Sequence, residues 1–261
     1  MAFNACGSDF ATPFRSHCAD THILFIGLSK LNHSCRPNTY FHYENGIAKL
    51  RATKTIRKDE ELTMNYFPMV CLILPSKIQE GIKEGFLGDC KCSDCSLPYG
   101  TSVLTKVIDE TRAYNIIKRT EVVLELYSAL LCLGVAREAN FPRFEANVKK
   151  LLKMQEGVLG DTNILRMRLL ALKCFHIRGP PNEQLEDLEK LAKYLKLAFG
   201  ENHMELIKVY NNLLEVSHCL LDVFRIGYYT KELFRLQQVI LDENDPTVEI
   251  CKFMASFLQS L

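Results

Sequence analysis

The chain has 261 residues, of which 48% are hydrophobic and 24% are charged, a composition typical of an ordered globular protein. Its 32 Lys and Arg residues nearly balance its 31 Asp and Glu residues, which argues against a globally basic nucleic-acid binder. No apolar run is long enough for a transmembrane helix, and the first residues lack the basic and apolar regions of a signal peptide. We therefore expect an intracellular protein, in the cytoplasm, the nucleus or both, with no membrane partner.

Short runs typical of β-strands, separated by polar turns, fill the first hundred residues. Residues 39–43 and 47–53 flank an Asn-Gly pair at 45–46, which predicts a β-hairpin because both residues tolerate the positive φ of a tight turn. A polar turn at 57–61 precedes a further strand-like run at 62–67. This half is expected to consist of strands and loops.

From about residue 101 the apolar residues recur at helical spacing, beginning with Val103, Leu104, Val107 and Ile108. Further helical runs extend over 164–175 and 185–199, and an Asn-x-x-Glu sequence at 202–205 resembles a capping box. We expect an all-α region here.

A weak internal repeat lies within the helical half. Residues 159–170 echo residues 199–210 at an offset of 40 residues. Such an offset is typical of helix-pair repeats that stack into a solenoid, as in tetratricopeptide arrays. An ordinary helical bundle is the alternative, in which the Gly-acidic pairs only mark helix starts.

Eleven cysteines are present, and an odd number in a chain without a secretion signal argues against a disulfide framework. Cys90, Cys92 and Cys95 form a C-x-C-x-x-C sequence. Thiolates bind zinc, and a structural zinc site needs four ligands, so a fourth must come from elsewhere in the chain. Three unrelated thiols are the alternative.

A second polar motif, Leu-Asn-His-Ser-Cys-Arg-Pro-Asn, lies at residues 31–38. Together with Asp-Glu-Glu-Leu-Thr-Met-Asn-Tyr at 59–66 and the cysteine motif at 90–95, it resembles the SET methyltransferase family. The form of the motifs and the helical C-terminal half are similar to the SET-and-MYND (SMYD) branch in particular, and most of all to its arthropod members.

The resemblance implies an α+β fold with three parts. Residues 1–85 would form the C-terminal part of a β-rich SET domain, residues 86–100 a post-SET zinc-binding segment, and residues 101–261 a tetratricopeptide-like helical domain. It also implies S-adenosyl-L-methionine and Zn²⁺ as cofactors, and a protein substrate with a target lysine. The helical domain is then a candidate surface for a peptide partner.

Roles carry over from the family residue by residue. Tyr66 matches the catalytic tyrosine. The resemblance assigns zinc ligation to Cys35, Cys90, Cys92 and Cys95. The residues assigned to the cofactor are Asn32, His33, Ser29, Asn4 and Phe86.

The sequence also departs from the family pattern. No Gly-x-Gly cofactor loop precedes Asn32, and no MYND module is present. Gly88 stands where the family has an aromatic residue. We therefore expect the SET domain to be N-terminally incomplete and this polypeptide alone to bind S-adenosylmethionine poorly, with weak or no activity.

Three functions are consistent with these motifs. The first is a protein-lysine N-methyltransferase that acts on histone or non-histone substrates. The second is a catalytically dead SET-derived scaffold that binds partners through its zinc site and helical domain. The third, a zinc-dependent nucleic-acid adaptor, is disfavoured by the near-zero net charge, and we do not expect nucleic acid among the partners.

Overall fold

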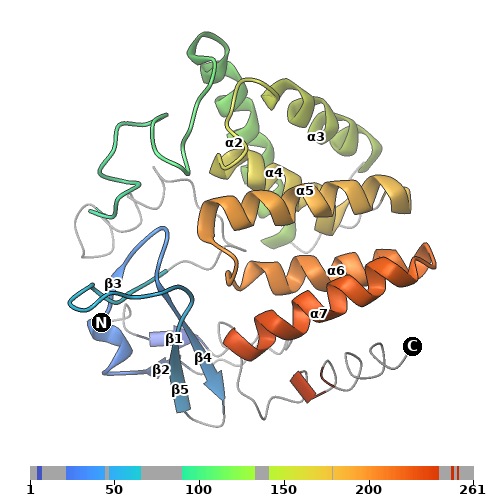
Figure 1. Cartoon of the computed structure of the whole chain (residues 1–261). Helices are drawn as coiled ribbons and strands as arrows, with labels where there is room; N and C mark the ends of the chain where they lie inside the picture. The colour runs from blue at the N-terminus through green and yellow to red at the C-terminus, as the bar shows by residue number, and fades with distance from the viewer. Residues whose placement is uncertain are drawn as a thin grey trace. The chain divides into compact units, whose positions relative to one another are not determined.

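The structure is a computed structural model, and it describes residues 5–7, 22–44, 47–65, 90–132, 141–177, 179–240, 248–249 and 252. The chain divides into two compact units, one made of Met1–Ser96 with Phe199–Leu261 and the other of Leu97–Ala198. Among the described residues, the first unit holds the strands, a 3-10 helix and the helices α6 and α7, and the second holds the helices α2 to α5 (Figure 1). The three sequence-based boundaries, at 85, 100 and 261, stay a prediction.

Short strand pairs make up the β-structure of the first unit. The described strands form three two-stranded sheets, β1 with β2, β3 with β6 and β4 with β5. The pairs β1–β2 and β4–β5 are antiparallel, whereas β3–β6 is parallel. The strands are β1 (Ala5–Gly7), β2 (His22–Leu24), β3 (Asn32–His33), β4 (Thr39–Glu44), β5 (Ile47–Ala52) and β6 (Thr63–Met64), with a 3-10 helix η2 (Leu28–Lys30) before β3.

The predicted hairpin is confirmed. Strands β4 and β5 pair in antiparallel register from Thr39 opposite Ala52 to Glu44 opposite Ile47. The Asn-Gly turn at 45–46 lies outside the described residues. The run at 62–67 forms a strand only at Thr63–Met64 within the described part of the chain.

Six helices follow in the part of the chain that the structure describes, so the predicted helical C-terminal half is confirmed. The runs at 164–175 and 185–199 lie within α4 and α5. The helices are α2 (Glu110–Cys132), α3 (Phe141–Gln155), α4 (Ile164–His176), α5 (Pro181–Phe199), α6 (Glu205–Cys219) and α7 (Val223–Ile240).

The helical reading of residues 103–108 is wrong, because α2 begins only at Glu110. The hydroxyls of Ser102 and Thr105 lie 2.9 Å apart, and the Ser102 hydroxyl accepts from the Thr105 amide. Such local side-chain bonds compete with a helix. The backbone of this segment pairs instead with residues 158–164, for example through Ile108 N–H to the Val158 carbonyl at 2.8 Å.

The capping box predicted at Asn202 and Glu205 is also wrong. Helix α6 has Met204 at its N-cap, with no side-chain cap. The Asn202 amide donates instead to the Thr53 carbonyl at 3.1 Å, and its oxygen accepts from Arg235 at 2.7 Å. Asn202 therefore joins the end of strand β5 to helix α7 within the first unit, a role that depends on partners far away in the sequence.

Helices α6 and α7 pack side by side in the first unit (Figure 1). Leu206 and Leu213 of α6 and Leu236 of α7 are fully buried. Burying one leucine side chain contributes about 1.5–3 kcal/mol, so these side chains stabilise the folded unit. The rings of Tyr210 and Tyr229 also meet across the pair, 5.9 Å apart.

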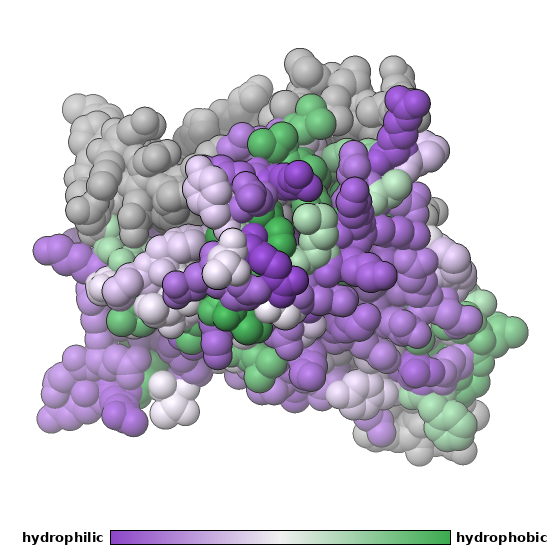
Figure 2. Space-filling model, turned by 90° about the horizontal axis from the view of Figure 1, so that it is seen from above, coloured by the Kyte–Doolittle hydropathy of each residue, from purple (hydrophilic) through white to green (hydrophobic). Residues whose placement is uncertain are grey.

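Charged and polar residues cover most of the described surface in the view of Figure 2, with apolar residues in smaller areas between them. None of the helices, as far as the structure describes them, is long and apolar enough to cross a membrane.

Candidate active site and metal centre

A parallel strand pair brings the first two motifs together. Asn32 lies opposite Thr63, and His33 lies opposite Met64. The Ser34 amide extends the pairing by donating to the Met64 carbonyl at 3.0 Å. The segment at 31–38 is thereby held against the segment that leads to Tyr66.

Asn38 ties these two segments together through both ends of its side chain. Its amide oxygen accepts from the Thr63 backbone at 2.8 Å, and its amide nitrogen donates to the Glu61 carbonyl at 2.8 Å and to a Glu60 carboxylate oxygen at 3.1 Å. The residue is only 3% exposed. A buried amide with its bonds satisfied orders the loop, because any other loop path would leave it unpaired.

Sequence reasoning gave Asn38 no role. The second Asn of the motif was visible, but its partners lie more than twenty residues further on in the chain. Only the fold reveals that contact.

Four cysteine thiols converge beside this strand pair. The sulfur atoms of Cys35, Cys90, Cys92 and Cys95 all lie within 4.8 Å of one another, and those of Cys35 and Cys95 are 3.4 Å apart. Sulfurs bound at about 2.3 Å to one tetrahedral zinc would be separated by about 3.8 Å. The thiol set therefore fits a structural zinc ion.

Hydrogen bonding within the cluster shifts the pKa values of the thiols in opposite directions. Bonds from Cys90 and the other thiols raise the pKa of Cys35, whereas bonds donated by Cys35 and its neighbours lower the pKa of Cys92. Close packing thus already favours a thiolate at Cys92, and a thiolate is the form that binds a metal.

A second contact joins the two cysteine-bearing segments. The Arg36 guanidinium lies 3.8 Å from the Asp94 carboxylate, whose side chain is 5% exposed. Arg36 follows Cys35 in the chain, and Asp94 precedes Cys95. The ion pair therefore holds in place the same two backbones that the thiols connect.

Asn32 and Ser29, two of the residues assigned to the cofactor, each have a hydrogen-bond partner in this unit. Asn32 is exposed, and its amide donates to the Glu61 carboxylate at 2.5 Å. Ser29, on η2, donates its hydroxyl to the Ile26 carbonyl at 2.8 Å. An amide and a carboxylate are groups that suit the ammonium and carboxylate of an amino-acid ligand.

His33 faces the thiols. Its Nε2 atom lies 3.6 Å from the sulfur of Cys35. Burial lowers the pKa of His33 to about 4, so the imidazole is neutral at pH 7. The structure thus places Asn32 and His33 on one strand but at two different contacts, one with Glu61 and one beside the cysteines.

Three predicted site residues, Tyr66, Asn4 and Phe86, lie outside the described residues. Their assignments stay predictions. Of the predicted set, the structure brings together the four cysteines with His33, and it places Asn32 on the same strand as His33.

Comparison with known proteins relates the segment that contains this strand pair to a protein family. Residues 6–67 match the family model described as SET domain. This segment belongs to the SET domain family. The match includes the strand pair and Cys35, and it ends one residue after Tyr66.

Curated relatives are named as lysine methyltransferases or SET proteins. The chain is 38% identical to "Histone-lysine N-methyltransferase ASHR1" of Arabidopsis thaliana over 73 residues, 28% of this chain and 15% of that protein. It is 34% identical to "SET domain-containing protein SmydA-8, isoform B" of Drosophila melanogaster over 98 residues, 37% of this chain and 21% of that protein.

A longer match reaches beyond the SET segment. The chain is 26% identical to "Histone-lysine N-methyltransferase SMYD1" of Homo sapiens over 164 residues, 57% of this chain and 33% of that protein. The SET-domain family and the SMYD-like character inferred from the motifs are thus confirmed. The matched regions span a third or less of the length of these relatives.

Proposed function

We propose that this chain carries an S-adenosylmethionine-dependent protein-lysine N-methyltransferase site, supported by a structural zinc ion. The observation that carries the proposal is the parallel pairing of Asn32–His33 with Thr63–Met64. This pairing aligns the segment assigned to the cofactor with the segment that ends at the proposed catalytic tyrosine. The lysine methyltransferase names of the relatives support the reaction class.

Zinc would be held by Cys35, Cys90, Cys92 and Cys95. Four protein ligands complete a tetrahedron, so this ion would be structural and would leave no position for substrate. Its effect would be to fasten the post-SET segment at 90–95 to the cofactor-binding motif and so to form one wall of the pocket.

The cofactor would be held by Asn32, His33, Ser29, Asn4 and Phe86. When bound, S-adenosylmethionine supplies the methyl group for transfer to a lysine amine. The Tyr66 hydroxyl would orient the acceptor and exclude water near it, because positioning accounts for much of the rate of such displacements. The substrate class is a protein with a target lysine, histone or non-histone.

The remaining parts of the proposal concern partners and location. A tetratricopeptide-like arrangement of the helices would offer a surface for a peptide partner, as in other helical repeats. The free thiols of Cys35, Cys90, Cys92 and Cys95 suit the reducing conditions of the cytoplasm or nucleus. Both features are compatible with a modifying enzyme that reaches protein substrates inside the cell.

A second candidate function is a catalytically dead scaffold. The observation that favours it is the 2.5 Å bond between the Asn32 amide and the Glu61 carboxylate. That bond occupies a donor that the cofactor would need, so cofactor binding must replace it. In the scaffold, the same bond would simply stabilise the strand pair.

Isothermal titration of S-adenosylmethionine into the zinc-loaded chain separates the two functions. The enzyme proposal predicts one cofactor per chain with a dissociation constant above about 1 μM, and at least about tenfold weaker binding by Asn32→Ala. Glu61→Gln should not weaken binding, because the Asn32 amide donates more weakly to a neutral glutamine than to the Glu61 carboxylate and is more easily released to the cofactor. If neither the wild type nor Glu61→Gln gives a heat of binding with S-adenosylmethionine, the enzyme proposal is contradicted and the scaffold function is favoured.

A further inference from the structure

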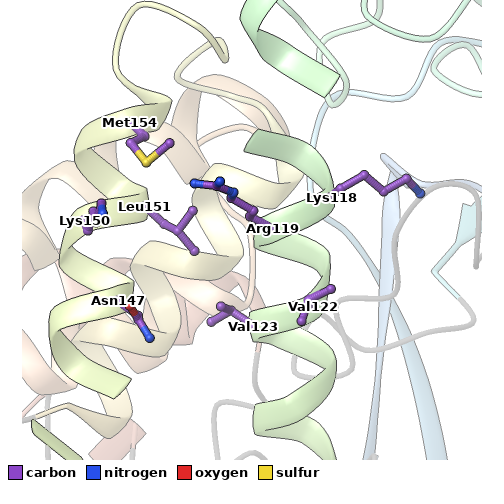
Figure 3. A pocket seen from close by; sticks show the side chains of 8 residues that line it. All are labelled: Lys118, Arg119, Val122, Val123, Asn147, Lys150, Leu151 and Met154. Carbon is purple, nitrogen blue, oxygen red and sulfur yellow. The ribbon is translucent and has the colours of Figure 1, made fainter. Parts of the chain in front are cut away.

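A groove of about 380 Å³ lies between helices α2 and α3, in the second unit and away from the SET segment in sequence (Figure 3). Each helix contributes pairs of residues four positions apart, which lie on one helix face. The lining residues are Lys118, Arg119, Val122, Val123, Asn147, Lys150, Leu151 and Met154.

Apolar side chains form the floor of this groove. Val123 and Leu151 point into the space between the helices (Figure 3), and Val122 is 62% exposed. Met154 adds a flexible thioether, which adapts to partners of different shape. The apolar surface continues along α2, where Leu126 is 51% exposed. Exposed apolar residues that lie together in this way favour a contact with another molecule.

Contacts between the two helices hold the groove in shape. The Gln155 amide donates to the Thr120 hydroxyl at 2.9 Å, and both residues are fully buried. Further along α2, the rings of Tyr127 and Phe144 stack with centroids 5.6 Å apart. The residues of α2 that line the groove, at 118–123, are therefore close in sequence to Thr120 and Tyr127, two positions at which α2 contacts α3. The groove is therefore preformed, which lowers the entropy cost of binding.

The charged residues that line the groove are all basic. Arg119 extends toward α3 (Figure 3), and Lys150 is exposed on α3. Among the described residues neither has an ion-pair partner, and no acidic side chain lines the groove. Lys118 differs, because it extends away from the groove and pairs with Glu121 at 3.1 Å.

We propose that the α2–α3 groove binds an acidic amphipathic segment of a partner protein. Apolar side chains of the segment would enter over Val123 and Leu151, and its carboxylates would pair with Arg119 and Lys150. Nucleic acid fits less well, because the floor is apolar and only two unpaired cations flank it, whereas nucleic-acid sites neutralise several phosphates. The groove does not depend on the proposed methyltransferase site.

The test uses the full chain and fluorescein-labelled synthetic helical peptides of about 20 residues. One peptide carries Leu along one face and Glu along the other, a second has Lys in place of every Glu, and a third has Ser in place of every Leu. A labelled DNA duplex of similar length is included. Fluorescence anisotropy is measured at about 50 and about 300 mM salt, because ion pairs at an exposed rim weaken with screening.

Charge reversal identifies the site. The double variant Arg119→Glu with Lys150→Glu should weaken binding of the Leu/Glu peptide by at least about tenfold. The control double variant, Lys190→Glu with Lys193→Glu, reverses two exposed cations on α5 of the same unit and should bind as the wild type does. All four positions are exposed, so the fold is retained, as circular dichroism would verify.

The expected pattern is binding of the Leu/Glu peptide alone, weakened by salt and lost only in the groove variant. Equal binding of the Lys or Ser peptide, equal loss in both double variants, or absence of binding would overturn the proposal. DNA that binds as tightly as the Leu/Glu peptide and is lost in the groove variant would identify a nucleic-acid site instead.

Discussion

The sulfur atoms of Cys35 and Cys95 lie 3.4 Å apart, although sixty positions separate the two residues in the sequence. One belongs to the motif at 31–38 and the other to the cysteine motif at 90–95. Their contact joins the strand pair of the SET segment to the loop that follows it. It is the structural basis for the proposed zinc site, and it makes that site testable one thiol at a time.

Replacement of one cluster thiol should abolish stoichiometric zinc binding. Cys92→Ser leaves three thiols and removes the one whose pKa is lowered by its neighbours, so we expect the purified chain to fall from one zinc to well below one. Metal content by mass spectrometry checks this. Cys219→Ser, at an exposed thiol outside the cluster, should retain one zinc. Equal zinc in all three proteins would contradict the four-cysteine site.

Loss of the Asp94 charge should weaken the attachment of the loop at 90–95. Asp94→Asn removes the negative charge that Arg36 faces, and since the Arg36 side chain is 34% exposed, water replaces part of the interaction. We expect a loss of about 1–2 kcal/mol in the free energy of unfolding, measured by urea titration of the zinc-loaded chain. The matched control is Glu121→Gln, which breaks the exposed pair with Lys118 and should change stability by less than about 0.5 kcal/mol. Equal effects would show that the Asp94 pair has no special role.

Removal of the Asn38 side chain should lower the free energy of unfolding by more than Asp94→Asn does. Asn38→Ala leaves the Thr63 amide and the Glu61 carbonyl without their partner, and both groups belong to the segment that reaches Tyr66. We expect a loss of about 2–4 kcal/mol by urea titration. Asn115→Ala, at an exposed position on α2, should cost less than about 1 kcal/mol. A neutral Asn38→Ala would mean that the segments are held together by other contacts.

Stability should depend on pH through His203. Burial lowers the pKa of His203 to about 4 in the folded chain, where its Nδ1 atom accepts from the Glu205 amide at 3.4 Å. Between pH 4 and 6.5 the unfolded chain therefore binds more protons at this residue than the folded chain, and its contribution to stability rises with pH. The imidazole also stacks on Phe199 at 4.5 Å, so His203→Phe keeps an aromatic ring in that place.

The comparison of wild type with His203→Phe isolates this effect. The unfolding free energy of the wild type, relative to the variant, should increase by about 1–3 kcal/mol from pH 4 to pH 6.5, and change little above pH 7. Glu205 acts in the opposite direction, since burial raises its pKa, but it is present in both proteins. Parallel pH curves for the two proteins would contradict the lowered pKa of His203.

Local patterns in the sequence predicted much of the fold. The β4–β5 hairpin and helices α4 and α5 follow from alternation and helical spacing, which depend on neighbouring residues. The errors arose where side-chain hydrogen bonds, local at Ser102 and Thr105 and distant at Asn202, decide the backbone conformation. Ser102 and Thr105 stop a helix that apolar spacing favours, and Asn202 binds Thr53, which lies 149 positions away, instead of capping α6.

The candidate site shows the same division. C-x-C-x-x-C indicates a metal from spacing alone, but the approach of Cys35 was implied only by family resemblance, because sequence spacing cannot show which distant thiol completes a set. Asn38 and Asp94 were not predicted, since their partners Glu61 and Arg36 are far away in the chain. The α2–α3 groove likewise requires two helices to be in place before Arg119 and Lys150 line the same groove.

Transfer of a tritiated methyl group from S-adenosylmethionine to a mixture of histone and non-histone proteins tests the central claim most directly. The zinc-loaded wild-type chain should label lysine at a weak but reproducible rate, and Tyr66→Phe should lower that rate by about a hundredfold. Tyr99→Phe, at an exposed tyrosine outside the motifs, should label as the wild type does. Labelling that survives Tyr66→Phe, or none by the wild type, would contradict a methyltransferase site at Tyr66.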